Sequence, residues 1–501
     1  DIPGLSRRRR QTEDENQQKK NIALLFDLVR LAKEKTSTLN KLIEMQSSNG
    51  GFTWFKGGPD DRYITQYIIT GIGHLRKLNA LGKDDYIMLK PIVDKALPYL
   101  DARLKEEYDN LKKYKTSLKN NNLSYSAIQY LYMRSYFPET AIGKKTQTAY
   151  TYYRDQSKKF WLKNSRYMQA MIALSLHRLG DTKTPAAVIS SLKENAIYKE
   201  ETGMYWKEFS TGGYYWHQAP IESQAMMIEA FSDIDKNQST INDLKTWLLK
   251  QKQTQQWKTT KATAEACYAL LLNGSDWLSE ENKVSIQLGN TVISNKDKTT
   301  EAGTGYFKQV IPGEKVQQGM GNIAVRISTP SGQSNTGATS WGAVYWQYFE
   351  DLDKITAAET PLKLVKQLFV EKNSDRGPVL KALKEGDDLQ IGDKVKVRIE
   401  LRVDRDMEYV HMKDMRAACM EPVNVISEYK WQGGLGYYET TKDASTSFFF
   451  GWLQKGTYVF EYPLFVTHSG NFSNGVTTIQ CMYAPEFTSH SNGIKVNVAG
   501  K

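Results

Sequence analysis

The chain has 501 residues, of which 40% are hydrophobic and 25% are charged, and it contains no long apolar run. This length and composition predict a globular chain of about two to four domains and exclude direct membrane insertion. The formal net charge of +11 is spread along the sequence, so we do not expect a nucleic-acid partner. Three cysteines are too few and too scattered for a disulfide framework.

The first residues, 1–20, read as a flexible or boundary segment. They carry four consecutive arginines, Arg7 to Arg10, which are followed closely by acidic residues. Such a run is typical of a solvated terminus. The segment has no charged stretch followed by an apolar one, so this chain carries no signal peptide that would indicate a location.

Helical spacing of apolar residues dominates from about residue 21 to residue 273. Residues 168–179 place their apolar side chains on one face, and Gly180 follows as a C-cap. Residues 64–78 show the same pattern, with Asp60 or Asp61 available to cap the first turn. The sequence therefore predicts amphipathic helices over this region.

The period of the apolar pattern changes from helical to two after Asn273-Gly274. Apolar residues alternate with polar ones over 284–288, 323–327 and 395–403. Alternation of this kind predicts β-strands with one buried face. We expect the second half of the chain to be β-structure.

A loop, a tryptophan and a helix recur in the first half. Trp54 follows the turn Asn49-Gly50-Gly51, Trp206 follows Gly203, and Trp257 begins a weaker copy. A loop aromatic of this kind can pack over the end of a helical hairpin, burying up to about 150–250 Å². Helical hairpins that pack on one another can close into a ring, so the repeats favour an α/α toroid.

The segment 42–58, LIEMQSSNGGFTWFKGG, resembles the signature L-x-x-x-Q-x-x-D-G-G-F-x-W-F-x-G-G in the helical thioester-type domain of bacterial alpha-2-macroglobulins. Asn49 stands where the family has an acid. Later segments, 341–349, 409–414 and 456–462, look like strands that complete a CUB-like domain and then form the C-terminal macroglobulin or receptor-binding-like sandwich.

This resemblance implies a multidomain α + β chain, with an N-terminal α/α toroid followed by two β-sandwich domains. The toroid would occupy residues 21–273, the CUB-like domain residues 274–357, and the receptor-binding-like sandwich residues 358–501. The chain would be a C-terminal fragment, because the family's bait region and earlier macroglobulin domains have no counterpart in it.

The covalent trap of the family does not carry over. That chemistry needs Cys-Gly-Glu-Gln, in which the glutamine side chain acylates the cysteine sulfur, and this chain lacks the motif. We expect Cys267 to be a small buried residue within a helix. Cys419 and Cys481 are expected to be unreactive residues of the sandwich. The thioester site is therefore predicted to be absent from this chain.

A catalytic site is not an expected feature, although one cluster of residues supports a rival. None of the six histidines forms a short metal-ligand pair, so neither a metal nor a cofactor is predicted. Tyr214, Tyr215 and His217 are of the residue types that move protons in polysaccharide lyases, which also combine an α/α toroid with β-sandwiches. Packing in a repeat connector is the other interpretation of this cluster.

The resemblance implies a non-enzymatic endopeptidase inhibitor that traps proteases by a conformational change. Containment by this chain would be steric. The partners would be target proteases and the upstream domains of the parent chain, in the periplasm or the cell envelope. The alternative is a lyase that acts on an acidic polysaccharide.

Overall fold

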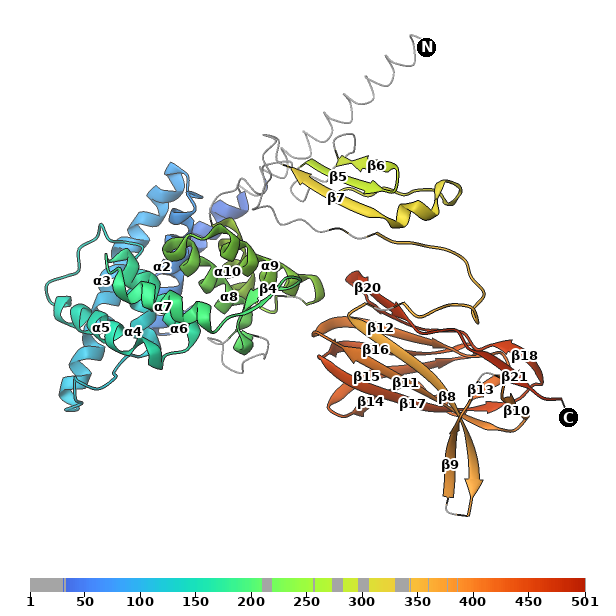
Figure 1. Cartoon of the computed structure of the whole chain (residues 1–501). Coiled ribbons are helices and arrows are strands. Elements are labelled where there is room, and N and C mark those ends of the chain that lie inside the picture. The colour runs from blue at the N-terminus through green and yellow to red at the C-terminus, as the bar shows by residue number, and fades with distance from the viewer. Residues whose placement is uncertain are drawn as a thin grey trace, which may run out of the picture. The chain divides into compact units, whose positions relative to one another are not determined.

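The computed structural model describes residues 30, 33–209, 219–255, 257–272, 283–295, 306–328, 342, 344–358, 360–375, 377–384 and 386–500. It contains a helical region, a three-stranded sheet and a larger C-terminal β-region (Figure 1).

The helical region begins with a helix at residues 33–45. The helices that follow are α2 (Arg62–Lys77), α3 (Lys83–Lys113), α4 (Tyr125–Arg134), α5 (Gln147–Phe160), α6 (Arg166–Arg178), α7 (Lys183–Glu194), α8 (Pro220–Ala230), α9 (Gln238–Thr254) and α10 (Thr260–Leu271). Two short hairpins join them: β1 (Phe52–Thr53) with β2 (Asp60–Asp61), and β3 (Ile197–Lys199) with β4 (Gly203–Tyr205).

Local capping explains where several of these helices start. Asp61 is the N-cap of α2, and its carboxylate accepts a 2.8 Å hydrogen bond from the Ile64 amide. Ser124 caps α4 in the same way, accepting from the Ala127 amide at 3.0 Å. Capping of this kind satisfies backbone donors that lack a partner inside the helix. The predicted helices over 64–78 and 168–179 are confirmed as α2 and α6.

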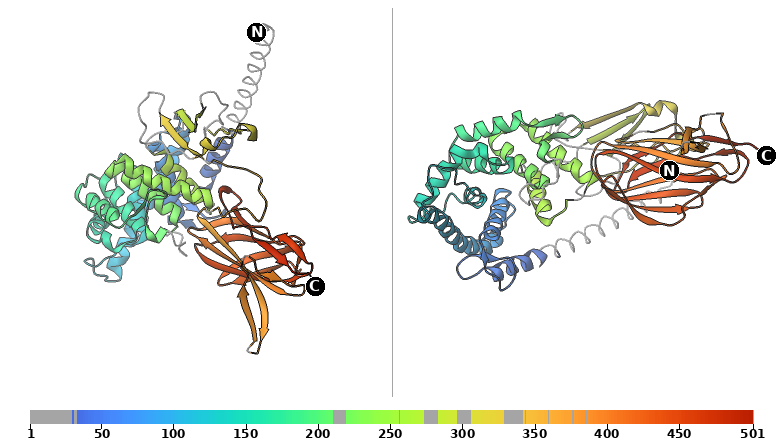
Figure 2. Two further views of the ribbon diagram at one scale, coloured as in Figure 1. Left: turned by 45° about the vertical axis from the view of Figure 1, so that its right-hand side comes forward. Right: turned by 90° about the horizontal axis from the view of Figure 1, so that it is seen from below.

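Alternate helices of this region pack on one another. Helix α2 contacts α4, α4 contacts α6, and α6 contacts α8, whereas α3 packs against α5 and α7 packs against α6. In the right-hand view of Figure 2, the blue to green helices follow one another round a curve. The largest buried side chains of the region include Phe52, Tyr130, Tyr153 and Trp206.

A three-stranded antiparallel sheet follows, in the order β6-β5-β7. Its strands are β5 (Lys283–Leu288), β6 (Thr291–Ser294) and β7 (Ile323–Ser328). The strands predicted over 284–288 and 323–327 are confirmed. The change of period at Asn273-Gly274 falls outside the described residues.

The C-terminal β-region consists of a five-stranded sheet in the order β13-β17-β11-β8-β9, a six-stranded sheet in the order β14-β15-β16-β12-β19-β20, and a small sheet β10-β21-β18. The strands are β8 (Leu362–Ser374), β9 (Gly377–Ala382), β10 (Asp388–Leu389), β11 (Lys394–Val403), β12 (Met407–Met415), β13 (Met420–Pro422), β14 (Glu428–Gln432), β15 (Leu435–Lys442), β16 (Ser445–Leu453), β17 (Gly456–Val466), β18 (Gly470–Ser473), β19 (Thr477–Cys481), β20 (Ala484–His490) and β21 (Lys495–Val498).

One hydrophobic core lies between the five-stranded and six-stranded sheets. Strand β11 buries every second residue, which confirms the alternation predicted over 395–403. Phe448 of the six-stranded sheet contacts Phe460 of the five-stranded sheet with ring centroids 5.4 Å apart. Both sheets therefore bury their inward faces against each other, and their outward faces meet solvent. The multidomain α + β class predicted for the chain is confirmed.

Candidate functional site

The Asn-Gly-Gly turn joins three segments of the helical region. Gln46 Nε2 donates hydrogen bonds to the carbonyl oxygens of Gly50, at 3.1 Å, and Ile92, at 2.9 Å. The Phe52 amide donates to Thr65 Oγ1 at 2.8 Å. Hydrogen bonds from this turn therefore reach α2 and α3, which gives the motif an architectural role.

Glycine is required within the turn for steric reasons. Gly50 has a φ of +95°, and a Cβ there would lie 2.1 Å from the carbonyl oxygen of Lys95. A positive φ and so close an approach both exclude a side chain. The resemblance in this segment thus reflects packing geometry.

The three repeat tryptophans have different surroundings. Trp206 is fully buried and donates from Nε1 to the Leu192 carbonyl at 2.9 Å. Trp54 is 55% exposed and stacks on Tyr63, with centroids 6.1 Å apart. Trp257 is half-buried. Trp206 is therefore packed in the core of the helical region, whereas Trp54 lies at its surface.

The rival catalytic cluster, Tyr214, Tyr215 and His217, lies outside the described residues.

The cysteines depart from expectation at one position. Cys267 is exposed, contrary to the prediction, because it shares a solvent-facing strip of α10 with Thr263 and Ala264. Cys419 and Cys481 are buried in the core between the sheets, as predicted. Burial raises the pKa of both of these thiols, which disfavours the reactive thiolate.

A central polar cluster lies among the inner helices of the helical region. It draws on α2, α4, α6, α8 and α10, and its members are His74, Lys77, Tyr132, Tyr136, Arg178, Glu229, Glu265 and Tyr268. Charged groups at such depth are stable only when they are paired or hydrogen-bonded.

Glu229, which is 1% exposed, is the best-satisfied member of the central polar cluster. Its carboxylate accepts hydrogen bonds from the hydroxyls of Tyr132 and Tyr136. Tyr268 donates to it at 2.6 Å, and the Arg178 guanidinium also donates at 2.6 Å.

Two charges keep Glu229 ionised. Burial alone would raise the pKa of its carboxyl, but Arg178 and Lys77 lower it, and the net pKa lies well below the ordinary range. Arg178 and Lys77 also pair with Asp233, at 2.8 and 2.6 Å, which balances the charge locally. The Glu229 carboxylate is therefore ionised, and it contacts side chains of four other helices, α2, α4, α6 and α10.

His74 and Glu265 form a second, weakly coupled pair, with Nδ1 and Oε2 3.9 Å apart. Burial lowers the pKa of His74 to about 4, and burial raises the pKa of Glu265 to about 7. Both groups are therefore neutral between these pH values, so their contact is not an ion pair there. His74 also stacks on Tyr268, with centroids 3.6 Å apart, and its Nε2 lies 3.0 Å from the Tyr132 hydroxyl.

Tyrosines extend the cluster around Glu265. Burial, and then the charge of Glu265, raise the pKa of Tyr63 to about 12 and raise the pKa of Tyr67. Lys261 and Glu222 act on the same carboxyl, the first lowering its pKa and the second raising it. A carboxyl whose pKa is about 7 therefore lies close to tyrosine hydroxyls whose pKa values are raised above the ordinary range.

Sequence reasoning did not identify this cluster. One signal was present: Glu229 interrupts the apolar run Ala225-Met226-Met227-Ile228 on α8. A carboxylate within an apolar stretch of a helix indicates a buried partner. The partners themselves come from helices far apart in the sequence, so spacing alone does not reveal them.

The C-terminal β-region has its own buried ion pair. Lys366 Nζ lies 2.7 Å from Asp414 Oδ1, and these side chains are 1% and 0% exposed. Tyr462 and Thr477 donate their hydroxyls to the same carboxylate. The pair links β8 to β12, strands of the two facing sheets, and its saturation with hydrogen bonds indicates a structural role.

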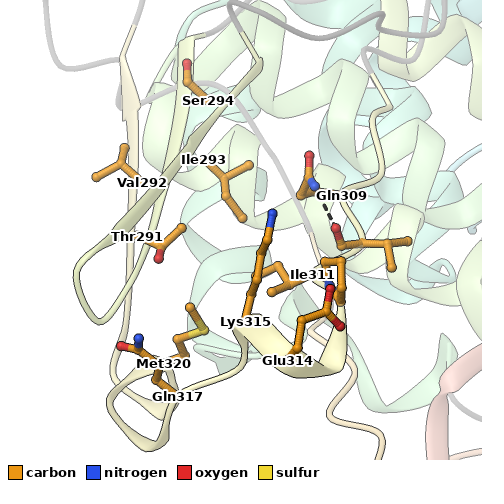
Figure 3. A pocket seen from close by; sticks show the side chains of 12 residues that line it. Thr291, Val292, Ile293, Ser294, Gln309, Ile311, Glu314, Lys315, Gln317 and Met320 are labelled. Carbon is orange, nitrogen blue, oxygen red and sulfur yellow. Dashed lines mark hydrogen bonds between the residues drawn. The ribbon is translucent and has the colours of Figure 1, made fainter.

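A shallow hollow of about 630 Å³ lies on the three-stranded sheet (Figure 3). Its lining mixes aliphatic side chains such as Val292 and Ile311 with the charged Glu314 and Lys315. It contains none of the central polar cluster.

Two negative findings concern the described residues alone. No group of three His, Cys, Asp or Glu side chains there could hold a metal ion. Every helix within the described ranges is too short or too polar to cross a bilayer.

Comparison with protein families matches residues 362–486 to the Bacterial Alpha-2-macroglobulin MG10 domain. A search among curated proteins finds no match.

Among solved structures, Escherichia coli alpha-2-macroglobulin activated by trypsin is similar at 12% identity and a TM-score of 0.38, over 92% of this chain and 29% of that one. The same protein activated by porcine elastase is similar at 13% identity and a TM-score of 0.38, over 92% of this chain and 38% of that one. Salmonella alpha-2-macroglobulin reacted with methylamine is similar at 13% identity and a TM-score of 0.32, over 91% of this chain and 27% of that one.

The chain thus spans about a quarter to two fifths of the length of these three relatives. At such identities and TM-scores, the assignment rests on the MG10 match and on the strands that form that domain. The match begins at the first residue of β8 and ends within β20, so it takes in both large sheets. Residues 362–486 of the chain thus match the MG10 domain of bacterial alpha-2-macroglobulins.

Proposed function

We propose that this chain is the C-terminal part of an alpha-2-macroglobulin-like endopeptidase inhibitor and is not an enzyme. The observation that carries the proposal is the match of residues 362–486 to the MG10 domain. Solved relatives include Escherichia coli proteins described as activated by trypsin and by porcine elastase. We extend this reaction with proteases to the protein that contains this chain.

We further propose the domain arrangement implied by the sequence. Residues 1–20 are a boundary segment and residues 21–273 an α/α toroid, which the packing of alternate helices supports. Residues 274–357 complete a CUB-like domain. Residues 358–501 form a macroglobulin sandwich, which the core shared by two sheets supports.

The proposed mechanism is mechanical. Cleavage of a bait segment elsewhere in the parent chain releases a strained arrangement of domains, and the domains of this chain then move to hinder access to the protease. Steric containment agrees with the cysteines: Cys419 and Cys481 are buried, and Cys267 lies in α10, where Glu265-Ala266-Cys267-Tyr268 contains no glutamine. An acyl trap would need both groups in one shielded turn.

The partners in this proposal are target proteases and the upstream domains of the parent chain, in the periplasm or cell envelope. Nucleic acid is not a partner.

The test compares a large and a small substrate. The full-length protein that carries this chain is mixed with trypsin or elastase, and hydrolysis of a protein substrate and of a chromogenic peptide is followed. A steric trap lowers hydrolysis of the protein and spares that of the peptide. The matched control is the same inhibitor cleaved beforehand, which has already used its conformational change.

Other outcomes contradict the proposal in distinguishable ways. Equal loss of both activities would indicate blockage of the protease active site, and no loss would indicate that the protein is not an inhibitor. Methylamine should add no mass to residues 1–501; a gain beside one of the cysteines would show a thioester. Sustained formation of unsaturated sugar from an acidic polysaccharide, abolished by His217→Ala, would favour the lyase.

A further inference from the structure

The outward face of the six-stranded sheet carries a row of aromatic side chains that crosses neighbouring strands. Tyr429 pairs with Tyr438, Tyr438 pairs with Phe449, and Phe449 pairs with His411. Because Phe448 and Phe450 point into the core, Phe449 and its partners point outward. Tyr429 is 66% exposed, and Tyr438 and Phe449 are each 39% exposed.

Two pairs of rings in this row contact each other. Tyr429 and Tyr438 have centroids 5.9 Å apart, and His411 stacks on Phe449 at 4.6 Å with an interplanar angle of 13°. Neighbouring strands lie about 4.8 Å apart, so residues paired across strands bring their rings into register. Because Tyr438 and Phe449 are paired across β15 and β16, these two ring pairs form an aromatic strip over β14, β15, β16 and β12.

Two glycines, which have no side chains, lie beside the aromatic strip. Gly436 and Gly451 are each two residues along the strand from Tyr438 and Phe449, so strand alternation places them on the same outward face. A Cβ at Gly451 would meet no atom within 4 Å. The sheet therefore has an open trough along one side of the aromatic strip.

Trp431 closes one end of the trough. It pairs with Gly436, and a Cβ placed there would lie 3.0 to 3.2 Å from three atoms of the six-membered ring of Trp431. The ring covers the glycine, yet the side chain remains 77% exposed. One face of a large indole is thus held in place by the backbone and presented to solvent.

The other side of the aromatic strip is polar. Thr440 pairs with Ser447, Ser447 with Lys413, and Lys413 with Thr478, on the same outward face. Neither this row nor the aromatic strip contains an acidic residue, and Lys413 is exposed. These two rows therefore combine aromatic rings, hydroxyl groups and one exposed cation, without an acidic side chain.

We propose that this face binds an acidic polysaccharide. Sugar rings present C–H faces that pack on aromatic side chains, while their hydroxyl groups hydrogen-bond to the polar row. The trough, bare at Gly451, leaves room for a chain laid across the strands. A carboxylate on the sugar is complementary to Lys413, because the two rows beside it contain no acidic side chain.

The composition of the face favours a glycan over two other partners. The cores of protein interfaces combine aromatics with methionine, and the row Tyr429, Tyr438, Phe449 and His411 has no aliphatic member. Single-stranded nucleic acid needs a basic groove along its backbone as well as stacking, and the two rows contain only one lysine. Both partners remain as outcomes of the test.

The test is calorimetric titration of the whole chain with polygalacturonate oligosaccharides at low and high salt. Trp431→Ala and Tyr429→Ala should each raise Kd on the order of tenfold, as loss of an aromatic anchor does in other interfaces. Lys413→Ala should weaken binding about fivefold and remove most of the salt dependence. Phe465→Ala is the matched control, because Phe465 is 43% exposed on the five-stranded sheet and should change nothing.

Several results would overturn the proposal. Absence of binding, or binding that neither Trp431→Ala nor Tyr429→Ala weakens while both variants keep the parent melting temperature, excludes this face as a glycan site. Equal affinity for neutral cello-oligosaccharides excludes the acidic ligand, and tighter binding of single-stranded DNA assigns the face to nucleic acid. If the parent chain binds no glycan and Trp431→Ala loses protease trapping, this face is assigned to a contact with protein. In every other outcome the protease-trapping assay is independent of the glycan titration.

Discussion

Glu265→Gln tests the neutral pair of the central polar cluster, because it removes a carboxyl whose pKa is about 7 in the folded chain. In an unfolded chain the same carboxyl titrates near 4.5. Between these values the folded state binds a proton that the unfolded state has lost, so the Glu265 contribution to stability falls as pH rises. His74, with a pKa lowered from 6.5 to about 4, contributes with the opposite sign.

The magnitudes of the two contributions are similar. Each pKa differs by 2.5 between the folded and unfolded states, which at 1.36 kcal/mol per pH unit amounts to about 3 kcal/mol. From pH 4.5 to 6.5 they cancel in the parent chain. Glu265→Gln leaves the His74 contribution alone, so the variant should gain up to about 3 kcal/mol on the parent between pH 4.5 and 7.

The assay is urea unfolding followed by circular dichroism at the helical minimum, at several pH values. Differences between variant and parent are compared, because they cancel the titration of other groups. His74→Gln should show the reverse trend, with stability relative to the parent falling as pH rises. This variant loses the His74 contribution, which rises with pH, and keeps the Glu265 contribution, which falls. Glu194→Gln is the matched control, because Glu194 is an exposed glutamate on α7.

One result would refute this reasoning. If Glu265→Gln and Glu194→Gln differ from the parent by the same amount at every pH, then Glu265 is solvated and the cluster around it is open to water.

The remaining predictions concern packing. Trp206→Ala should lower the free energy of unfolding by about 3–5 kcal/mol, since it leaves a cavity in a fully buried site; a loss below about 1 kcal/mol in denaturant melts would contradict this. Gly50→Ala should cost about 3 kcal/mol or more, because its φ is positive and its Cβ would meet the Lys95 carbonyl; an unchanged melting temperature would be incompatible with that clash. Lys366→Met should cost about 3–5 kcal/mol by leaving Asp414 buried and unpaired, and adding Asp414→Leu should recover part of the loss.

Periodic features were predictable from the sequence. The cap of α2 and strand β11 depend on neighbours in the chain: the cap was predicted at Asp60 or Asp61 and lies at Asp61, and the alternation predicted over 395–403 falls within β11. The exposed side of α10 was not, because Cys267 lies among small residues that do not indicate which face is buried. The partners of a buried charge could not be predicted from the sequence. Glu229 and Lys77 are 152 residues apart, and only the packing of α2 near α8 brings them together.

The donors that neutralise Glu229 have a consequence for biosynthesis. They come from Lys77, Tyr132, Tyr136 and Arg178, which precede α8, and from Tyr268, which follows it in α10. A growing chain therefore exposes its buried carboxylate before its last donor has been made, and the domain cannot close vectorially helix by helix. A ribosome that stops before α10 would release a chain whose centre holds an incompletely satisfied anion, a state suited to recognition by chaperones and proteases.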